Sequence, residues 1–125
     1  MNARRHSIAV RIGTVTVGGD APISVQSMTK TDTRDVAATT AQVQALARAG
    51  SDIVRLAVPD MEAAAALPEI RAGSPVPLVA DIHFDHRLAL AAIDAGIDAL
   101  RLNPGNMRRR EHLEKVVARA KEREI

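Results

Sequence analysis

The chain has 125 residues, of which 46% are hydrophobic, and a formal net charge of +2 at pH 7. This length fits one domain but is only about half of the roughly 250 residues of a complete (β/α)8 barrel. The sequence contains no cysteine and one aromatic residue, Phe84. It therefore excludes disulfides, thiolate metal ligands and the aromatic stacking surfaces of single-strand nucleic-acid binders. The modest basicity fits a small anionic ligand better than a nucleic-acid duplex.

Targeting segments are not evident in the sequence. No apolar run reaches the roughly 20 residues of a membrane helix. The first ten residues contain two arginines but not the long apolar stretch of a secretory signal. We therefore expect a cytoplasmic protein that binds neither nucleic acid nor membranes.

Residues 8–19 open the chain with two β-prone runs around Gly13 and Thr14. This pattern predicts a β-hairpin, which we expect at the N-terminal mouth of the sheet that follows. Apolar runs then alternate with helical patterns. They predict strands at 23–28, 53–58, 78–82 and 99–102, and helices at 35–49, 61–71, 85–96 and 110–122.

Strands that alternate with helices indicate a parallel sheet. The predicted fold class is α/β, namely the first half of a TIM (β/α)8 barrel, written (β/α)4, with an N-terminal β-hairpin. All of residues 1–125 fall in this one partial TIM-barrel domain. Asp35 is placed to cap the first helix, and Pro68 is expected to kink or shorten the second.

One internal repeat relates residues 49–56 to residues 95–102. Alanine, glycine, aspartate, arginine and leucine recur at the same places. The Ala-Gly-x-Asp part is a common connection from a helix to a strand, but it does not explain the arginines. The repeat predicts that Arg55 and Arg101 stand at matched positions of alternate strands.

Polar residues interrupt the predicted strands near their carboxyl ends, where parallel sheets bind ligands. Because side chains alternate along a strand, one choice of direction turns all of these residues inward while the apolar residues between them face the helices. The inward set is Arg55, Asp81, His83, Arg101 and Asn103, and we add Gln26 on the strand at 23–28.

This inward set carries more positive than negative charge. Arg55 and Arg101 are permanently cationic, and Asp81 is the anion expected opposite them. Since an unpaired buried charge is costly, the surplus predicts a bound anion, and the planar guanidinium fork suits phosphate. The alternative is an ionic layer inside the barrel, balanced by water and by other strands.

Other polar residues have two interpretations each. His83 is either a core histidine or, given its spacing from Asp81, part of the site. Asn103 and Asn106 either form the turn around Pro104 and Gly105 or hold a substrate oxygen. The arginines at 108–110 are either solvated or contact a phosphate or a partner, and His86 is expected to be solvated.

A family resemblance is carried by four segments: VQSMTKTDTRD (25–35), DIVRLAVPD (52–60), PLVADIHFDHRLAL (77–90) and LRLNPGN (100–106). Together they resemble the hydroxymethylbutenyl diphosphate synthases, iron–sulfur oxidoreductases of the methylerythritol phosphate route to isoprenoids and terpenoids. The similarity extends over nearly the whole chain from Arg4 onward. VADIHF and NPGN, in this order and spacing, are its specific parts.

The resemblance implies a TIM-barrel domain and a C-terminal domain whose [4Fe-4S] cluster is held by three cysteines and a glutamate. It implies reductive conversion of 2-C-methyl-D-erythritol 2,4-cyclodiphosphate to 4-hydroxy-3-methylbut-2-enyl diphosphate, with electrons from ferredoxin or flavodoxin. It also implies a homodimer, and a small diphosphate substrate bound by Arg55 and Arg101, with Asp81, His83 and Asn103 nearby.

The chain itself departs from that family in having no cysteine and too few strands. We therefore expect the iron–sulfur domain to be absent, no cluster to be bound by this chain, and the chain alone to be inactive, with no catalytic residue assigned. Its edge strands favour self-association. Two alternatives stay open: a non-catalytic phosphate-binding half-barrel, and another TIM-barrel enzyme of the dihydropteroate-synthase type.

Overall fold

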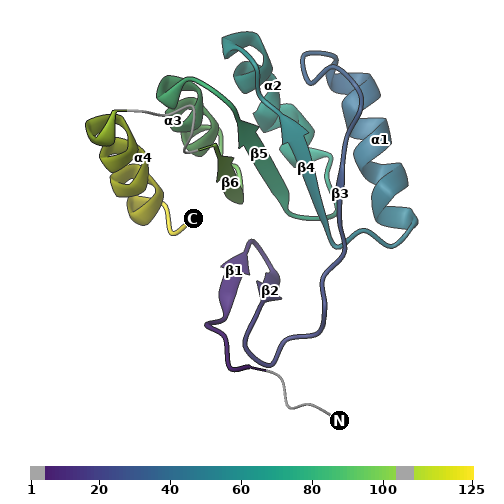
Figure 1. Ribbon diagram of the computed structural model, residues 1–125. Coiled ribbons are helices and arrows are strands. Elements are labelled where there is room, and N and C mark those ends of the chain that lie inside the picture. Colours follow the sequence, from purple (N-terminus) through teal and green to yellow (C-terminus); the bar gives the residue numbers. More distant parts are fainter. Residues whose placement is uncertain (1–4, 104–108) are drawn as a thin grey trace.

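Strands and helices alternate in the computed structural model, which describes residues 5–103 and 109–125 (Figure 1). The hairpin strands come first, β1 (Val10–Ile12) and β2 (Val15–Val17). Four strand–helix units follow: β3 (Gln26–Met28), α1 (Val36–Arg48), β4 (Ile53–Ala57), α2 (Met61–Ala72), β5 (Leu78–Ile82), α3 (His86–Asp94), β6 (Ala99–Leu102) and α4 (Arg110–Glu122).

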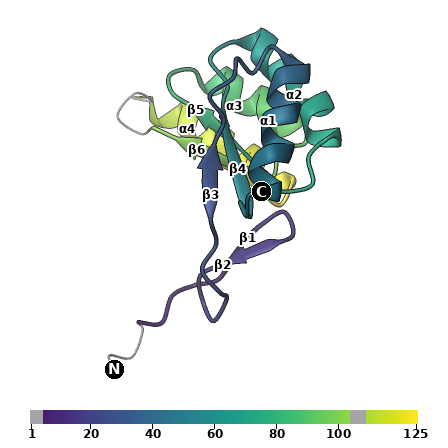
Figure 2. The same cartoon turned by 90° about the vertical axis from the view of Figure 1, so that its right-hand side faces the viewer.

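The second sheet is parallel and has the strand order β3-β4-β5-β6, so β3 and β6 are its edges within the described residues. The helices lie on one side of this sheet and leave its other face open (Figures 1 and 2). The α/β class and the half-barrel arrangement predicted from the sequence are confirmed. None of the helices in the described part of the chain is long and apolar enough to cross a membrane.

Aspartates start the first three helices. The carboxylates of Asp35, Asp60 and Asp85 accept hydrogen bonds from backbone N–H groups of the first turn, at 3.1, 2.9 and 2.9 Å. Such caps satisfy N–H groups that have no partner within the helix. The prediction for Asp35 is therefore confirmed, and the helix starts are fixed at the carboxyl ends of the strands.

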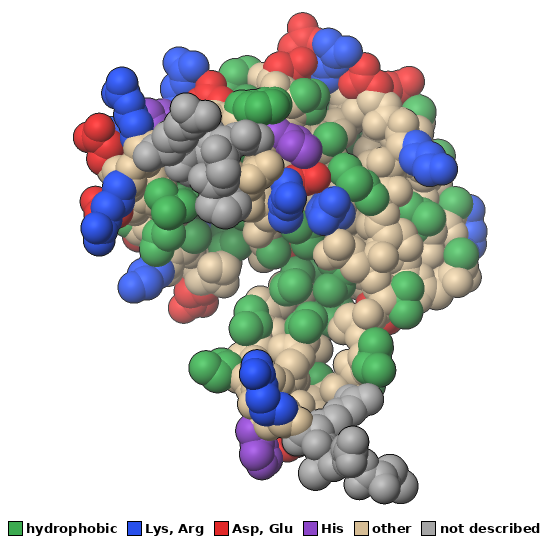
Figure 3. Space-filling view, viewed as in Figure 1, with side chains coloured by type: hydrophobic (Ala, Val, Ile, Leu, Met, Phe, Trp, Pro, Cys, Tyr) green, Lys and Arg blue, Asp and Glu red, His purple; other side chains and the backbone are tan. Residues whose placement is uncertain are grey.

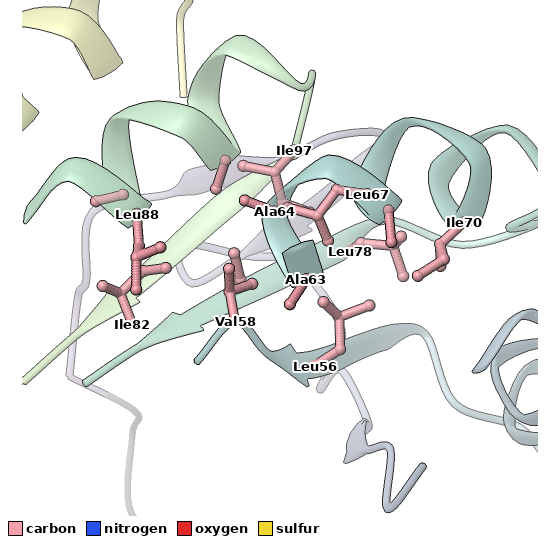
Figure 4. Packing of buried hydrophobic residues seen from close by; sticks show 14 of the residues in the cluster. Leu56, Val58, Ala63, Ala64, Leu67, Ile70, Leu78, Ile82, Leu88 and Ile97 are labelled. Atoms are coloured by element: carbon pink, nitrogen blue, oxygen red, sulfur yellow. The ribbon is translucent and has the colours of Figure 1, made fainter. Parts of the chain in front are cut away.

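The hydrophobic core lies between the sheet and its helices (Figure 4). It takes every second residue of β4 and β5, and the helices contribute aliphatic side chains from α2 and α3. Members of this cluster include Val54, Leu56, Leu78, Ala80, Ile82, Leu67, Ile70, Leu88 and Ile93. The predicted alternation is therefore correct for these two strands, and Arg55 and Asp81 are left on the open face.

Two local predictions need correction. β3 begins at Gln26 and not at residue 23, because the N–H of Val25 bonds the Asp52 carboxylate at 2.8 Å and the regular ladder starts one residue later. Pro68 does not shorten α2, which continues to Ala72. The buried side chains of Leu67 and Ile70 hold this part of the helix against the core and offset the hydrogen bond that proline cannot make.

The repeated aspartates join neighbouring strands at their starting ends. Asp52, just before β4, accepts the N–H of Val25 before β3, and Asp98, just before β6, accepts the N–H of Leu78 at 2.8 Å. Asp98 also pairs with Arg71 of α2, whose terminal nitrogen donates to it at 3.0 Å. The aspartate of the repeat thus has a structural role, because it aligns β4 with β3 and β6 with β5.

The hairpin lies near the starting ends of the strands (Figure 1). Gly13 forms its tip with a φ of 58°, and a Cβ there would come within 3.0 Å of the Pro77 and Asp98 side chains. Pro77 directly precedes β5 and Asp98 directly precedes β6. The tip of the hairpin therefore lies at the end of the sheet opposite the helix caps.

Candidate anion-binding site

The Asp81 side chain is the centre of a cluster on the open face of the sheet. Its Oδ1 lies 3.2 Å from a terminal nitrogen of Arg101, which donates a hydrogen bond to it. Its Oδ2 lies 3.5 Å from Nε of Arg55 and 3.4 Å from Nε2 of His83. Three residues that the sequence analysis placed together thus meet at one carboxylate.

Charged side chains of both signs and a histidine gather on this open face, toward the carboxyl ends of the strands (Figure 3). The Asp81 side chain is only 2% exposed, whereas those of Arg55, Arg101 and His83 are 29%, 41% and 45% exposed. Two permanent cations therefore face one carboxylate, and the surplus charge lies on the exposed side of the cluster. A site of this kind favours an anionic ligand.

The two arginines come together through the stagger of the sheet. Arg55 pairs with Val79, and Arg101 pairs with Asp81, so the arginines are two residues apart in the hydrogen-bond ladders. Matched ladder positions, as the repeat predicted, are therefore not observed. An offset of two residues over two strands is the stagger of a barrel with a shear of 8 over eight strands, in which alternate strands contribute to one layer.

The Arg55 guanidinium retains hydrogen-bonding capacity. Its Nε is buried and has no hydrogen-bond partner among the described residues, since the 3.5 Å approach to Asp81 does not meet the geometry of a bond. A terminal nitrogen donates to the sulfur of Met28, at 3.5 Å, and thioether sulfur is a weak acceptor. This guanidinium can therefore donate hydrogen bonds to a stronger acceptor such as a phosphate oxygen.

The other predicted site residues lie in three different situations. Asn103 follows β6, and its N–H bonds the carbonyl of Ile82 at 3.4 Å, which keeps it at the carboxyl end of the sheet. Gln26 pairs with Ile53 at the start of the sheet. It is four residues below the level of Asp81, or roughly 13 Å at 3.3 Å per residue, and is not brought to the cluster. Asn106 lies outside the described residues.

A cavity of about 290 Å³ adjoins the cluster between the ends of β4 and β5. His83 forms part of its wall together with Met61, Phe84 and Leu88, so the wall is mostly apolar. Phe84 is exposed and its ring centroid lies 6.0 Å from that of His83. The sequence identified Phe84 only as the single aromatic residue, and its place beside the site was missed.

The loop after β3 is fixed close to the site by side-chain hydrogen bonds. The hydroxyl of Thr33 donates to the carbonyl of Ala57 at 2.6 Å, and Ala57 is the ladder partner of Asp81. The Arg34 guanidinium donates two hydrogen bonds to the Asp32 carboxylate, and its Nη1 lies 3.6 Å from Oδ2 of Asp60. The Arg34 guanidinium lowers the pKa of Asp32 to about 2, so this pair is fully charged at neutral pH.

His86 and His112 join α3 to α4 behind the site. Their rings are stacked with centroids 3.7 Å apart and an interplanar angle of 15°. The prediction that His86 is solvated is therefore wrong, because α4 covers it. Burial is the main cause that lowers the pKa of His86, and the nearby His112 is the second cause. Arg110, in contrast, is exposed and pairs with Glu114, at 3.1 Å, which matches the solvated interpretation of this residue, whereas Arg108 lies outside the described residues.

The described part of the site does not have the side chains that a metal ion or an iron–sulfur cluster needs as ligands. Within the described residues, no group of three or more His, Asp or Glu side chains is arranged to hold a metal ion. The sequence has no cysteine, so the thiolates that hold iron–sulfur clusters are lacking. The residues of this chain do not fit such a cluster, and no step of chemistry through one is assigned to them.

Comparison with known proteins gives consistent matches over the whole chain. Residues 7–125 match the profile of the family described as the GcpE TIM-barrel domain. A protein of Dehalococcoides mccartyi named 4-hydroxy-3-methylbut-2-en-1-yl diphosphate synthase (flavodoxin) is 60% identical over 125 residues, which are 100% of this chain and 36% of that protein.

Two more proteins with this name are similarly close. The one from Maridesulfovibrio salexigens is 62% identical over 98% of this chain and 34% of its own length, and the one from Pseudomonas putida is 57% identical over 98% and 33%. This chain therefore spans about a third of the length of these curated relatives.

Among solved structures, a Xanthomonas albilineans dihydropteroate synthase superposes with a TM-score of 0.66. The match covers 89% of this chain and 46% of that one at 20% sequence identity. At this identity the likeness establishes the fold alone.

Proposed function

We propose, because this chain belongs to the GcpE TIM-barrel domain family, that it forms the diphosphate-binding half of the barrel in a 4-hydroxy-3-methylbut-2-enyl diphosphate synthase. The complete enzyme would reductively convert 2-C-methyl-D-erythritol 2,4-cyclodiphosphate to 4-hydroxy-3-methylbut-2-enyl diphosphate in isoprenoid biosynthesis. The shared name of the three relatives supports the product and the flavodoxin dependence.

One observation carries the assignment of the site. Arg55 and Arg101 come from different strands and approach the same carboxylate, at 3.5 and 3.2 Å, on the exposed side of the half-barrel. A diphosphate carries more negative charge than Asp81 and has several acceptor oxygens, so it can neutralise the surplus and engage both guanidinium forks.

Each residue of the cluster has a distinct part in this proposal. Arg55 and Arg101 bind phosphate oxygens, and His83 borders both the cluster and the apolar cavity, where it can donate a hydrogen bond to the ligand. Asn103 lies at the carboxyl end of the neighbouring strand and offers an amide near the same position. The cavity walls of Met61, Phe84 and Leu88 suit a carbon skeleton better than a phosphate.

The redox part of the reaction is assigned to other parts of the complete protein. A [4Fe-4S] cluster would supply electrons from ferredoxin or flavodoxin, and its ligands would come from residues outside this chain. A homodimer and a cytoplasmic location belong to the same proposal and rest on the family relationship. Sedimentation of the complete protein and fractionation of cells that express it test these two points.

The test uses a chimera in which residues 1–125 replace the matching segment of the Dehalococcoides mccartyi relative. Turnover of the cyclodiphosphate is measured with reduced flavodoxin for the chimera and for its Arg55→Ala and Arg101→Ala variants. Each variant loses one charged contact worth about 1.5–3 kcal/mol. We expect kcat/KM to fall roughly 10- to 150-fold, with the visible absorption of the cluster unchanged.

Arg48→Ala is the matched control, because Arg48 is an exposed arginine in the last turn of α1, away from the strand ends that carry the site. It removes the same charge and leaves turnover as it is in the unmodified chimera. Unchanged kinetics in both the Arg55 and Arg101 variants would refute the assignment of the site, and an inactive chimera with an intact cluster would refute the proposed activity.

A non-catalytic phosphate-binding half-barrel and an enzyme of the dihydropteroate-synthase type remain the alternatives. The first predicts phosphate binding by an oligomer of this chain without iron, and no specific contact favours it. The second draws on a likeness of fold at 20% identity, which carries no information on the substrate. Neither has support comparable to that of the arginine pair and the named relatives.

A further inference from the structure

We infer that Asp81 is a positioning residue, which spaces the guanidinium groups of Arg55 and Arg101 for a diphosphate and does not itself contact that ligand. The inference rests on the proposed function and gives a specific role to Asp81, which the sequence analysis placed opposite the two arginines and near the substrate.

Burial is the first argument. Asp81 is 1% exposed although it lies on the open face of the sheet, because its three partners cover it. The side chains of those partners are each between 29% and 45% exposed. A ligand that arrives from the open side therefore meets N–H donors first, and the carboxylate beneath them would only repel it.

The contact distances give the second argument. The approaches to Asp81 measure 3.2, 3.4 and 3.5 Å, whereas charge-assisted hydrogen bonds are typically about 2.7–2.9 Å. The carboxylate thus lies between its partners without binding any of them at close range. The closest approach of each arginine involves only one nitrogen of a guanidinium that carries five N–H groups, so Arg55 keeps donors for phosphate oxygens.

Electrostatic repulsion between the two arginines also requires a carboxylate at this place. Two guanidinium groups on alternate strands repel one another, and without an anion between them they would turn apart toward solvent. The negative charge of Asp81 allows both guanidinium groups to stay beside its carboxylate. The cluster of two arginines and one aspartate then keeps one net positive charge. An asparagine has a single acceptor oxygen and presents an NH2 group on its other side, so it can accept from one arginine but not from both sides.

The test uses the chimera described above and inorganic pyrophosphate as the ligand, with affinity measured by calorimetry. Asp81→Asn is expected to weaken binding at least 10-fold. Asp81→Glu keeps the charge but moves it by one methylene group, and it is expected to weaken binding as well, because the position of the carboxylate matters. The Nε–H NMR signals of Arg55 and Arg101, assigned from their alanine variants, should shift in both Asp81 variants.

Asp98→Asn is the matched control. Asp98 is another aspartate with an arginine partner and a side chain only 9% exposed, but it lies at the opposite end of the sheet. It should move the Arg71 signal and leave pyrophosphate affinity and the two site arginines unchanged. This control separates a local role of Asp81 from a general loss of stability.

Three results would overturn the inference. Wild-type affinity in either Asp81 variant would mean that the position of the carboxylate is unimportant. Weaker binding with unmoved arginine signals would mean that Asp81 contacts the ligand directly. An Asp98→Asn effect on affinity as large as that of Asp81→Asn would indicate a merely structural role. The proposed function fails separately, if the Arg55 and Arg101 alanine variants bind pyrophosphate as the chimera does.

Discussion

The two repeated aspartates offer a comparison of the same residue in the same role with different surroundings. Asp98 is 9% exposed in its side chain, accepts the N–H of Leu78 at 2.8 Å and pairs with Arg71. Asp52 accepts the N–H of Val25 at the same distance but is exposed and has no arginine among its hydrogen bonds to the described residues. We predict that Asp98→Asn destabilises this chain far more than Asp52→Asn does.

The magnitude follows from what the amide of each variant can still accept. In D52N the amide oxygen keeps the bond to the backbone, so we expect a loss of less than about 0.5 kcal/mol. In D98N the single amide oxygen can accept from the Leu78 N–H or from the Arg71 terminal N–H but not from both, and an NH2 group then faces the donor that is left, at a cost of about 1–3 kcal/mol. The lost ion pair adds at most about 1 kcal/mol, because Arg71 is 39% exposed.

Urea denaturation followed by far-UV circular dichroism measures both losses in the 125-residue chain. A loss of about 2–3 kcal/mol in D98N corresponds to a fall of roughly 6–12 °C in Tm for a domain of this size. If D98N proves no less stable than D52N, Asp98 does not hold β5, β6 and α2 together as its contacts indicate.

Further predictions concern the histidine pair and the hairpin tip. Because burial lowers the pKa of His86 below its usual 6.5, the unfolded chain binds the proton more tightly, so the free energy of unfolding should fall as pH drops below about 6.5. His86→Gln should flatten this slope in urea titrations between pH 7 and 5, and His6→Gln should not. The pKa of Asp85, which its hydrogen bonds with Arg87 lower, affects stability only at more acidic pH. Gly13→Ala adds a Cβ at a φ of 58° within 3.0 Å of Asp98. Amide hydrogen exchange in the hairpin should then become faster with little change in the core. Hairpin amides that exchange as slowly in Gly13→Ala as in the unmodified chain would contradict the docking of the tip.

Much of the fold could be predicted from the sequence because local signals agree with the packing. Strands 78–82 and 99–102 have the predicted bounds because apolar runs mark them, and the helix at 110–122 keeps its predicted bounds although no described side chain caps its start. β3 was overestimated because it is an edge strand, where a side chain replaces a ladder bond. The bounds predicted for α2, 61–71, agree with its observed end at Ala72 to within one residue, because burial of Leu67 and Ile70 outweighs the shortening expected of Pro68.

The candidate site was predictable in composition but not in all of its contacts. Strand alternation alone brought Arg55, Asp81, His83 and Arg101 to one face, and the structure joins them at 3.2–3.5 Å. Gln26 shares that face but lies lower on its strand, since register between strands cannot be read from one sequence. The stacking of His86 on His112 depends on how two helices pack, and nothing in the local sequence indicates it.

The central claim, that Arg55 and Arg101 together bind a diphosphate, is tested most directly by calorimetry of inorganic pyrophosphate with the chimera. Arg55→Ala and Arg101→Ala should each raise the Kd roughly 10- to 150-fold, and Arg48→Ala should leave it unchanged. Equal Kd values for the chimera and both site variants would contradict the claim.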